Sequence, residues 1–294
     1  MMHLARFHTA SLLFMLLQIA PAWAAEPTWP PTFYAMDTAF RRPGLSVDQQ
    51  LDLVKELGYP GIAWHEEKPE QIEALLTKLE TRGLKMFTIY CPTKITPNGD
   101  LTYSPTLTKL MRTLRGNGTI IWLHFGGKGP DIDSLTGREP AVHKLRALAD
   151  LAEANDLQIA IYPHLGEWTA GFRNATHLAQ VVDHDHFGVT FNLCHSLAGG
   201  EEAEIPTLLD QAKDVLVNVT ICGADGGVTG GKWGRLIQTL DKGTFDLVPL
   251  LRKLKQIGFT GPIGFQGYGI QDDARSILTP TIRAWHKLSA ASDD

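Results

Sequence analysis

The sequence has 294 residues, of which 44% are hydrophobic and 9% aromatic, and its formal net charge is −5 at pH 7. This composition is typical of a folded globular chain that is long enough to bury one large core. A mildly acidic chain without a basic run argues against nucleic acids and anionic membrane surfaces as partners. The cysteines, Cys91, Cys194 and Cys222, show no C-x-x-C spacing, so neither a zinc ribbon nor a redox motif is indicated. We expect three buried thiols, with a Cys194–Cys222 disulfide as the alternative.

The first 24 residues predict a cleaved signal peptide. Arg6 precedes the apolar run 12–17, and Ala22-Trp23-Ala24 matches the small-x-small pattern of a cleavage site. The run is shorter than the roughly 20 residues of a membrane-spanning helix, so removal is expected and anchoring is the alternative. The mature protein is therefore predicted to be periplasmic or secreted and free of the membrane. A proline-rich leader, 25–31, and a polar tail, 289–294, would flank the domain.

Eight short apolar runs, rich in residues that favour strands, alternate with helical patterns along the chain. The runs are Thr32–Met36, Gly61–Trp64, Lys85–Tyr90, Thr119–His124, Gln158–Tyr162, Phe187–Asn192, Leu216–Ile221 and Pro262–Gln266. Helix signals lie between them, such as the capping box from Ser46 to Gln49. Eight alternations in about 260 residues predict an α/β fold, a single-domain (β/α)8 TIM barrel over 32–288. An open doubly wound sheet is the alternative, but no G-x-G-x-x-G follows the first strand.

Polar side chains gather where the predicted strands end, which is where a barrel of this type places its chemistry. The candidate catalytic residues are His164, His195 and Asp225. The candidate substrate-binding residues are Trp64, His65, His124, Tyr162, Asn192, Lys232, Trp233 and Gln266. A single histidine or amide at a strand end can equally satisfy a loop, and a tryptophan can simply pack at the rim.

Side-chain alternation sharpens this picture, because residues two apart on a strand face the same side. The pairs predicted to point into the barrel combine a small residue with a polar one nearer the strand end. They are Ala160/Tyr162, Thr190/Asn192, Thr220/Cys222 and Gly264/Gln266, while Ile161, Phe191, Ile221 and Phe265 would face the helices. These inward residues predict the floor of a pocket, with small side chains deeper in the barrel and polar side chains at the strand ends.

The connection from Gly223 to Phe245 contains seven glycines around Asp225, Lys232 and Arg235. A loop of this length without structure of its own is usually functional or disordered. We expect it to cover the substrate, with Lys232 and Arg235 meeting an anionic or polyhydroxyl group. A solvated flexible loop is the alternative.

Three motifs carry a resemblance to a known family over roughly Thr32 to Trp285. "GYPGIAW" at the second strand, the N-x-x-H of "FNLCH" at the sixth and "GFTGPIGFQ" at the eighth resemble the xylose isomerase-like barrels. Within them, the likeness is to the sugar phosphate isomerase/epimerase group. "YPHLGEW", "FNLCHSL" and "GFQGYGI" are similar to an exported bacterial subfamily.

The resemblance implies a divalent metal held by Glu, Asp, His and Glu from strands five to eight, with the glutamates moving a proton beside a carbonyl. The corresponding positions here hold Tyr162, Asn192, Cys222 (or Ile221) and Gln266, and only His195 of the strand-six signature is retained. Hard divalent cations prefer anionic oxygens, so the usual metal site is expected to be lost. No cofactor is otherwise expected. A transition-metal site rebuilt from His164, His195 and Asp225 is the alternative, because imidazole suits such metals.

These features together predict an exported isomerase, epimerase or lyase that acts on a small-molecule carbohydrate, a keto-sugar or keto-glycoside. His164 or His195 would be the general base, since an ordinary imidazole titrates near neutral pH. Asn192, Gln266 and His124 would bind hydroxyls or the developing oxyanion, with Asp225 as partner acid. Two alternatives remain: a barrel that only binds sugar, and a metal-dependent hydrolase of the same superfamily. Export argues against a phosphorylated substrate.

Overall fold

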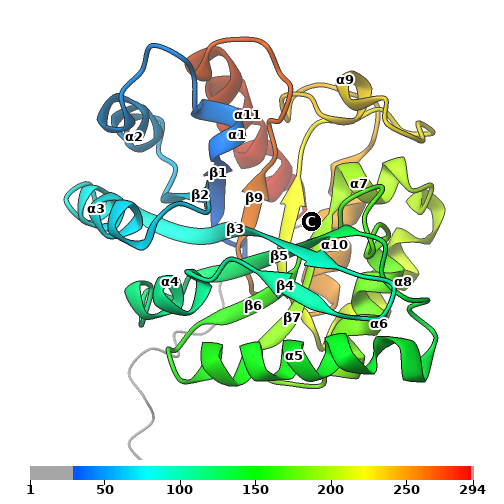
Figure 1. Ribbon diagram of the computed structural model, residues 1–294. Helices are drawn as coiled ribbons and strands as arrows, with labels where there is room; N and C mark the ends of the chain where they lie inside the picture. The colour runs from blue at the N-terminus through cyan, green and yellow to red at the C-terminus, as the bar shows by residue number, and fades with distance from the viewer. Residues whose placement is uncertain (1–28, 293–294) are drawn as a thin grey trace, which may run out of the picture.

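The computed structural model describes residues 29–292, so the predicted signal peptide lies outside the described residues. Eight parallel strands follow one another around a closed ring, in which the last strand pairs with the first (Figure 1). They are β1 (Phe33–Met36), β2 (Gly61–His65), β3 (Lys85–Ile95), β5 (Ile120–Gly127), β6 (Gln158–Ile161), β7 (Phe187–Asn192), β8 (Leu216–Ile221) and β9 (Ile263–Phe265). The predicted TIM barrel is confirmed.

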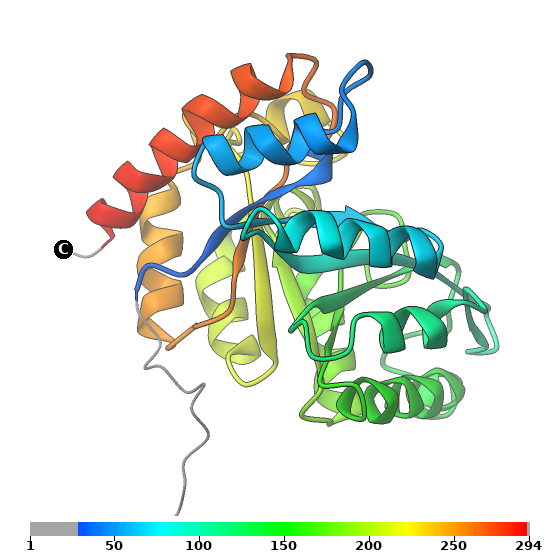
Figure 2. The same ribbon diagram turned by 90° about the vertical axis from the view of Figure 1, so that its left-hand side faces the viewer.

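Helices cover the outside of the ring, with α10 against α11 and with α3, α4 and α5 following one another along one flank (Figures 1 and 2). Their bounds are α1 (Asp37–Phe40), α2 (Val47–Glu56), α3 (Pro69–Glu80), α4 (Leu107–Thr113), α5 (Leu135–Glu153), α6 (Phe172–Val182), α7 (Leu193–Ala198), α8 (Ile205–Ala212), α9 (Trp233–Leu236), α10 (Leu247–Gln256) and α11 (Ala274–Ala291). A short 3-10 helix, Glu202–Glu204, precedes α8. Because α11 continues to Ala291, the tail predicted from Ser289 begins later. None of the helices within residues 29–292 combines the length and hydropathy that a membrane span requires.

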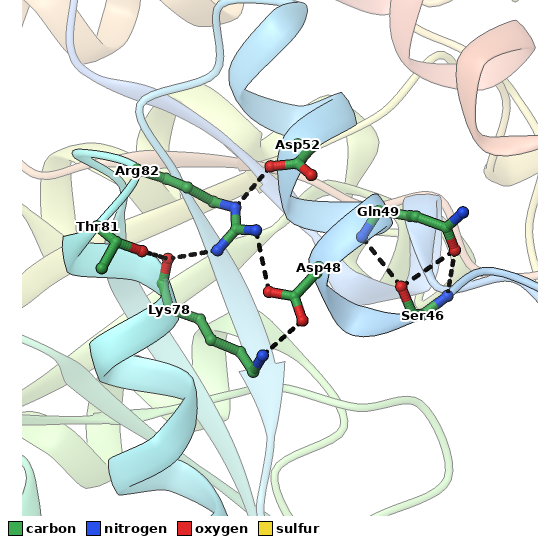
Figure 3. Close-up of polar contacts among 7 residues, drawn as sticks. All are labelled: Ser46, Asp48, Gln49, Asp52, Lys78, Thr81 and Arg82. Carbon is green, nitrogen blue, oxygen red and sulfur yellow. Dashed lines mark hydrogen bonds and ion pairs between the residues drawn. The ribbon is translucent and has the colours of Figure 1, made fainter.

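The capping box predicted at Ser46 is confirmed and begins α2 (Figure 3). The Ser46 hydroxyl accepts from the Gln49 backbone N–H at 3.3 Å, and the Gln49 side chain accepts from the Ser46 backbone N–H at 2.9 Å. In the same first turn, Asp48 pairs with Arg82, which follows α3, at 2.9 Å, and Arg82 also pairs with Asp52 of the next turn at 2.7 Å. These ion pairs tie the first two outer helices together on the surface.

The barrel interior is largely aromatic rather than small. Tyr34, Trp122 and Tyr162 fill it together with Ala160, which the alternation pattern placed there correctly. Gly264 of β9 makes room for the Tyr34 ring, since a Cβ at this position would lie 2.7 Å from that ring. The small inward residues predicted on the later strands are thus present at Ala160 and Gly264, but Tyr34 of β1 and Trp122 of β5, which the prediction did not consider, occupy the space beside them.

The residues of the later strands that were predicted to face the helices do so. Packed in the outer layer against the helices are Ile161, Phe191, Ile221 and Phe265. Cys222 is the exception and also joins the outer layer. The strand β8 ends at Ile221, so the alternation stops there, and the Cys222 thiol donates to the carbonyl of Leu236 at 3.1 Å. All three cysteines are free and buried, as expected.

One feature of the sheet was not predicted. The strand β3 continues past Tyr90 to Ile95 and forms an antiparallel hairpin with β4 (Leu101–Tyr103). The neighbouring strand β5 also continues, with Gly127 opposite Ile95. The sheet therefore extends beyond the ring on this side.

Candidate functional site

A cavity of about 380 Å³ lies at the end of the barrel where the strands finish. Seven of the predicted site residues line it, namely Trp64, His65, Tyr162, His164, His195, Trp233 and Gln266. The other eight lining residues were not predicted, and among them Asp37, Thr38, Tyr90, Trp122 and Tyr268 are polar or aromatic. These five follow or belong to β1, β3, β5 and β9, so most of the ring contributes to the wall.

Four predicted residues do not line the cavity. His124 stacks behind Tyr90 with ring centroids 4.4 Å apart. Asn192 is 1% exposed and accepts from the Cys194 thiol at 3.2 Å. Asp225 pairs with Arg235 of its own loop at 2.8 Å, and Lys232 is exposed at the start of α9. For His124, Asn192 and Asp225, a neighbour in the fold engages the polar group.

The glycine-rich connection has more structure than predicted. It contains α9 and a bridge between Gly223 and Gln238, and the Gly230 backbone N–H donates to the Ala198 carbonyl at 2.8 Å. Figure 1 shows α9 at the same end of the barrel as α7, with which it is in contact. Through Trp233 and Ile237 the connection supplies part of the cavity wall.

His195 is held by a backbone group that determines which of its ring nitrogens carries a proton. It lies on α7, is 5% exposed, and its Nδ1 accepts a hydrogen bond from the backbone N–H of Leu165 at 3.0 Å. Burial, reinforced by the neighbouring His164, lowers the pKa of His195 to about 3. The ring is thus neutral at physiological pH with its proton on Nε2. His195 is a hydrogen-bond donor toward the cavity, which differs from the expectation of a base titrating near neutrality.

His164 lies beside His195, with ring centroids 4.3 Å apart, and its ring nitrogens have different surroundings. Its Nδ1 is buried, has no hydrogen-bond partner among the described residues and lies 3.7 Å from Oε1 of Glu167, beyond hydrogen-bond distance. Burial lowers the pKa of His164, and the Glu167 carboxylate acts against this shift. The nearby carboxylate favours a proton on Nδ1 electrostatically, and the tautomer with that proton has its lone pair on Nε2, as a base acting toward the cavity requires.

Glu167 is the important residue that sequence reasoning missed. Its carboxylate accepts from Nδ1 of His124 at 2.8 Å and so connects His124 to His164. The signal was present in "YPHLGEW", where Glu167 follows His164 by three residues. Nothing local showed that the loop after β6 turns this side chain back toward the histidines.

The wall formed after β1 and β2 carries charge. Nδ1 of His65 lies 2.8 Å from Asp37, and Nε2 lies 2.8 Å from Glu67. The two carboxylates thus face the two ring nitrogens, and Nη1 of Arg41 lies 2.6 Å from Nδ1 and 2.8 Å from Nε2 of the same ring. In the ring of eight strands β2 and β7 are four steps apart in either direction, so His65 stands across the barrel from His195.

Gln266 is fixed at the floor of the cavity. Its Nε2 donates to the Tyr162 hydroxyl at 3.1 Å, while its Oε1 accepts from the Thr38 hydroxyl at 2.8 Å and from the Tyr268 backbone N–H at 3.0 Å. Burial raises the pKa of Tyr162, so the phenol stays protonated. Gln266 and Tyr162 therefore form a neutral polar floor.

The donor set does not fit the metal that the family resemblance implies. The four relevant positions hold a phenol, two amides and a thiol, and hydrogen bonding to Cys194 together with burial raises the pKa of the Cys222 thiol. None of these groups supplies the anionic oxygen that a hard divalent cation prefers. The predicted site of His164, His195 and Asp225 is not assembled either, because Asp225 is held by Arg235 away from the cavity wall.

Within the described part of the chain, the group with three ligand atoms within 4.8 Å of one another is Asp150, Glu153 and His184. It joins the end of α5 to the segment before β7, on the face where the strands begin. It therefore lies at the other end of the barrel from the cavity.

A closed (β/α)8 barrel whose strand ends surround a cavity lined by polar and aromatic residues defines a TIM-barrel protein. More specifically, residues 51–279 match the model of the xylose isomerase-like TIM barrel family, and the chain belongs to this family. A comparison with curated proteins found no match.

Solved structures with the same fold include several sugar enzymes. The IolI protein with a bound zinc atom is 16% identical, with a TM-score of 0.72, over 88% of this chain and 98% of that one. D-allulose 3-epimerase from Methylomonas sp. is 17% identical, with a TM-score of 0.65, over 88% and 98%. The 3-keto-D-glucoside 4-epimerase YcjR from E. coli is 15% identical, with a TM-score of 0.64, over 87% and 99%. At these identities the likeness shows the fold.

Proposed function

We propose that this protein is an exported isomerase or epimerase that moves a proton beside the carbonyl of a keto-sugar. The observation that carries the proposal is the pair of adjacent imidazoles with opposite polarity toward the cavity. His164 presents a lone pair on Nε2 in the tautomer that the Glu167 carboxylate favours, and His195 presents an N–H because Nδ1 accepts from Leu165. A base and a neutral donor side by side are what abstraction next to a carbonyl requires.

The reaction can be written with these two groups. Nε2 of His164 takes the proton from the carbon next to the carbonyl, and the C–H electron pair forms the double bond of an enediol. The carbonyl π electrons move to oxygen, which is stabilised by the N–H of His195. The epimer forms when the oxyanion re-forms the carbonyl and the proton returns to the opposite face of the same carbon. The isomer forms when the proton returns to the former carbonyl carbon, while the hydroxyl on the neighbouring carbon passes its proton to the oxyanion and becomes the new carbonyl.

The remaining walls support a sugar as the ligand. Trp64 and Trp233 offer flat apolar faces for a sugar ring, and Tyr268, which is 62% exposed, stands at the mouth of the cavity. Asp37 and His65 provide hydrogen-bonding partners for hydroxyls on the other side. Solved relatives of the same fold include enzymes named as epimerases of keto-sugars, which agrees with this choice.

The proposal is tested by incubating the purified protein with D-fructose or D-allulose in heavy water and following the sugar by proton NMR. We expect deuterium at C1 or C3 of the ketose, the two positions next to the C2 carbonyl. The His164→Gln variant keeps the shape of the site without a base and should lose the exchange. Exchange at the same rate in this variant would remove His164 from the mechanism.

A sugar-binding barrel without catalysis is the second candidate, and the absence of carboxylates at the four metal positions favours it. Calorimetric binding of ketoses without any exchange would establish this alternative. The same donor set does not favour a metal-dependent hydrolase.

A further inference from the structure

A second cavity of about 590 Å³ adjoins the central one. The two share His65 and Tyr90 as lining residues, so the side chains of these residues form the partition between them. We call this second space the side cavity. It is the more open of the two, and apart from Pro92 the rest of its wall comes from residues of polar type whose aliphatic parts form most of the lining surface: Glu66, Glu67, Lys68, Gln71, Ser104 and Thr106.

The side cavity is built by the part of the sheet that extends past the ring. Pro92 belongs to the continuation of β3, and Ser104 directly follows β4. Opposite them, Lys68 and Gln71 stand at the start of α3. The hairpin is not needed to close the barrel, because β3 already pairs with β2 and β5 within the ring. Its structural consequence is a polar compartment attached to the catalytic one.

The chemistry of the side cavity favours a neutral polyhydroxyl group. Its wall offers hydroxyls, an amide and an ammonium as donors, and carboxylates, an amide and hydroxyls as acceptors. Two glutamates against one lysine disfavour a phosphate or carboxylate there. Burial raises the pKa of Glu66, and the Ser104 hydroxyl acts against that shift, so this carboxyl already lies in a partly desolvated position.

We propose that the substrate is a keto-sugar glycoside, with the ketose in the central cavity and a second sugar in the side cavity. The linkage between the two sugars would pass between His65 and Tyr90. This inference rests on the proposed function for the identity of the first sugar and adds a second binding site to it.

The test compares D-fructose with lactulose, which is a fructose carrying galactose on O4, by isothermal titration calorimetry and by exchange in heavy water. We expect lactulose to bind at least about tenfold more tightly than D-fructose, as one or two well-formed hydrogen bonds provide. Thr106→Trp fills the side cavity and should remove this preference, and Gln71→Ala should reduce it severalfold.

Two matched controls lie outside both cavities. Thr102→Trp adds the same bulk to the exposed strand β4, and Glu73→Ala shortens an exposed side chain on the same helix as Gln71. Both should retain the lactulose preference.

The outcomes separate the two proposals. Exchange on D-fructose without any lactulose preference, or a preference that survives Thr106→Trp, overturns the side-cavity inference alone. A lactulose preference without exchange on either sugar supports the side cavity and overturns the catalytic proposal. If neither sugar binds, both proposals fail.

Discussion

The two walls of the central cavity use the same residue type in opposite ways. On the β2 side, His65 is 28% exposed and lies between the carboxylates of Asp37 and Glu67. On the β7 side, His195 is 5% exposed and its nearest polar partner is the backbone N–H of Leu165. The first environment is charged and partly exposed, whereas the second is buried and keeps its ring neutral. The comparison teaches that the partner of an imidazole, more than its place at a strand end, determines its chemical role.

The largest expected effect is that of removing the base. His164→Gln should lower the rate of proton exchange on a bound ketose by about 10²–10⁴-fold, the usual contribution of a general base. Ketose affinity by calorimetry should change far less than the rate. Glu167→Gln, which weakens the partner of Nδ1, should cause a smaller loss of rate. An affinity loss that matches the rate loss would show that His164 binds and does not catalyse.

His195 should be sensitive to which nitrogen is replaced. Asn imitates the Nδ1 side of the ring and can still accept from Leu165, whereas Gln places an amide donor near Nε2. We therefore expect His195→Asn to lose about 10²-fold or more in exchange rate, as for an oxyanion donor, and His195→Gln to retain more activity. The reverse ranking, measured by NMR under saturating ketose, would place the essential function on Nδ1.

Much of this comparison was accessible from the sequence. The eight strands, the inward positions of Ala160 and Tyr162, and the location of His65, His164 and His195 at strand ends all follow from hydrophobic periodicity and the barrel rule. These features depend on local pattern. They place the imidazoles on one rim, as the cavity lining shows.

The roles of the histidines were not accessible, because they depend on contacts between segments. The proton on Nε2 of His195 is determined by Leu165, which is 30 residues earlier in the chain. Asp37 meets His65 only because β1 and β2 are neighbours in the closed ring. In the sequence, Asp225 was an equally suitable candidate for a catalytic acid, and only the fold shows that Arg235 engages its carboxylate.

The neutral state of His195 also predicts a pH dependence of stability. Its folded pKa of about 3 lies below the ordinary 6.5, so as pH falls below 6.5 the unfolded chain binds a proton that the folded chain does not. The free energy of unfolding should therefore fall, by about 2 kcal/mol between pH 7.5 and 5.0 from this group. His164, whose pKa is also lowered, adds a loss of the same sign.

Urea denaturation of the wild type and of His195→Asn at the two pH values measures this contribution. The variant lacks the titrating ring, so its loss of stability on acidification should be smaller by about the same 2 kcal/mol. Equal losses in both proteins would mean that His195 is protonated in the folded state, and the contrast between the two walls would fail.

The charged wall should matter for binding more than for proton transfer. His65→Asn removes the partner shared by Asp37 and Glu67 and leaves both carboxylates at the edge of the cavity. We expect ketose affinity to fall by about tenfold, since charge-assisted hydrogen bonds to the ligand lose their alignment. The exchange rate at saturating ketose should fall much less. A rate loss as large as that of His164→Gln would give His65 a role in proton transfer.

The smallest effect on ketose binding is expected for a charge cluster remote from the cavity. A variant of this cluster serves as a control for the His65 result. Arg82 bridges Asp48 and Asp52 between α2 and α3, where the two carboxylates are 47% and 64% exposed (Figure 3). Solvent screens such pairs, so Arg82→Ala should lower the free energy of unfolding by about 1 kcal/mol or less. Ketose affinity and exchange should remain those of the wild type. If Arg82→Ala weakened ketose binding as strongly as His65→Asn, the His65 effect would reflect general loosening of the β2 side of the barrel. A binding loss confined to His65→Asn would instead assign the effect to the charged wall of the cavity. Both variants break carboxylate pairs on the same side of the molecule, but only His65 lies at the ligand.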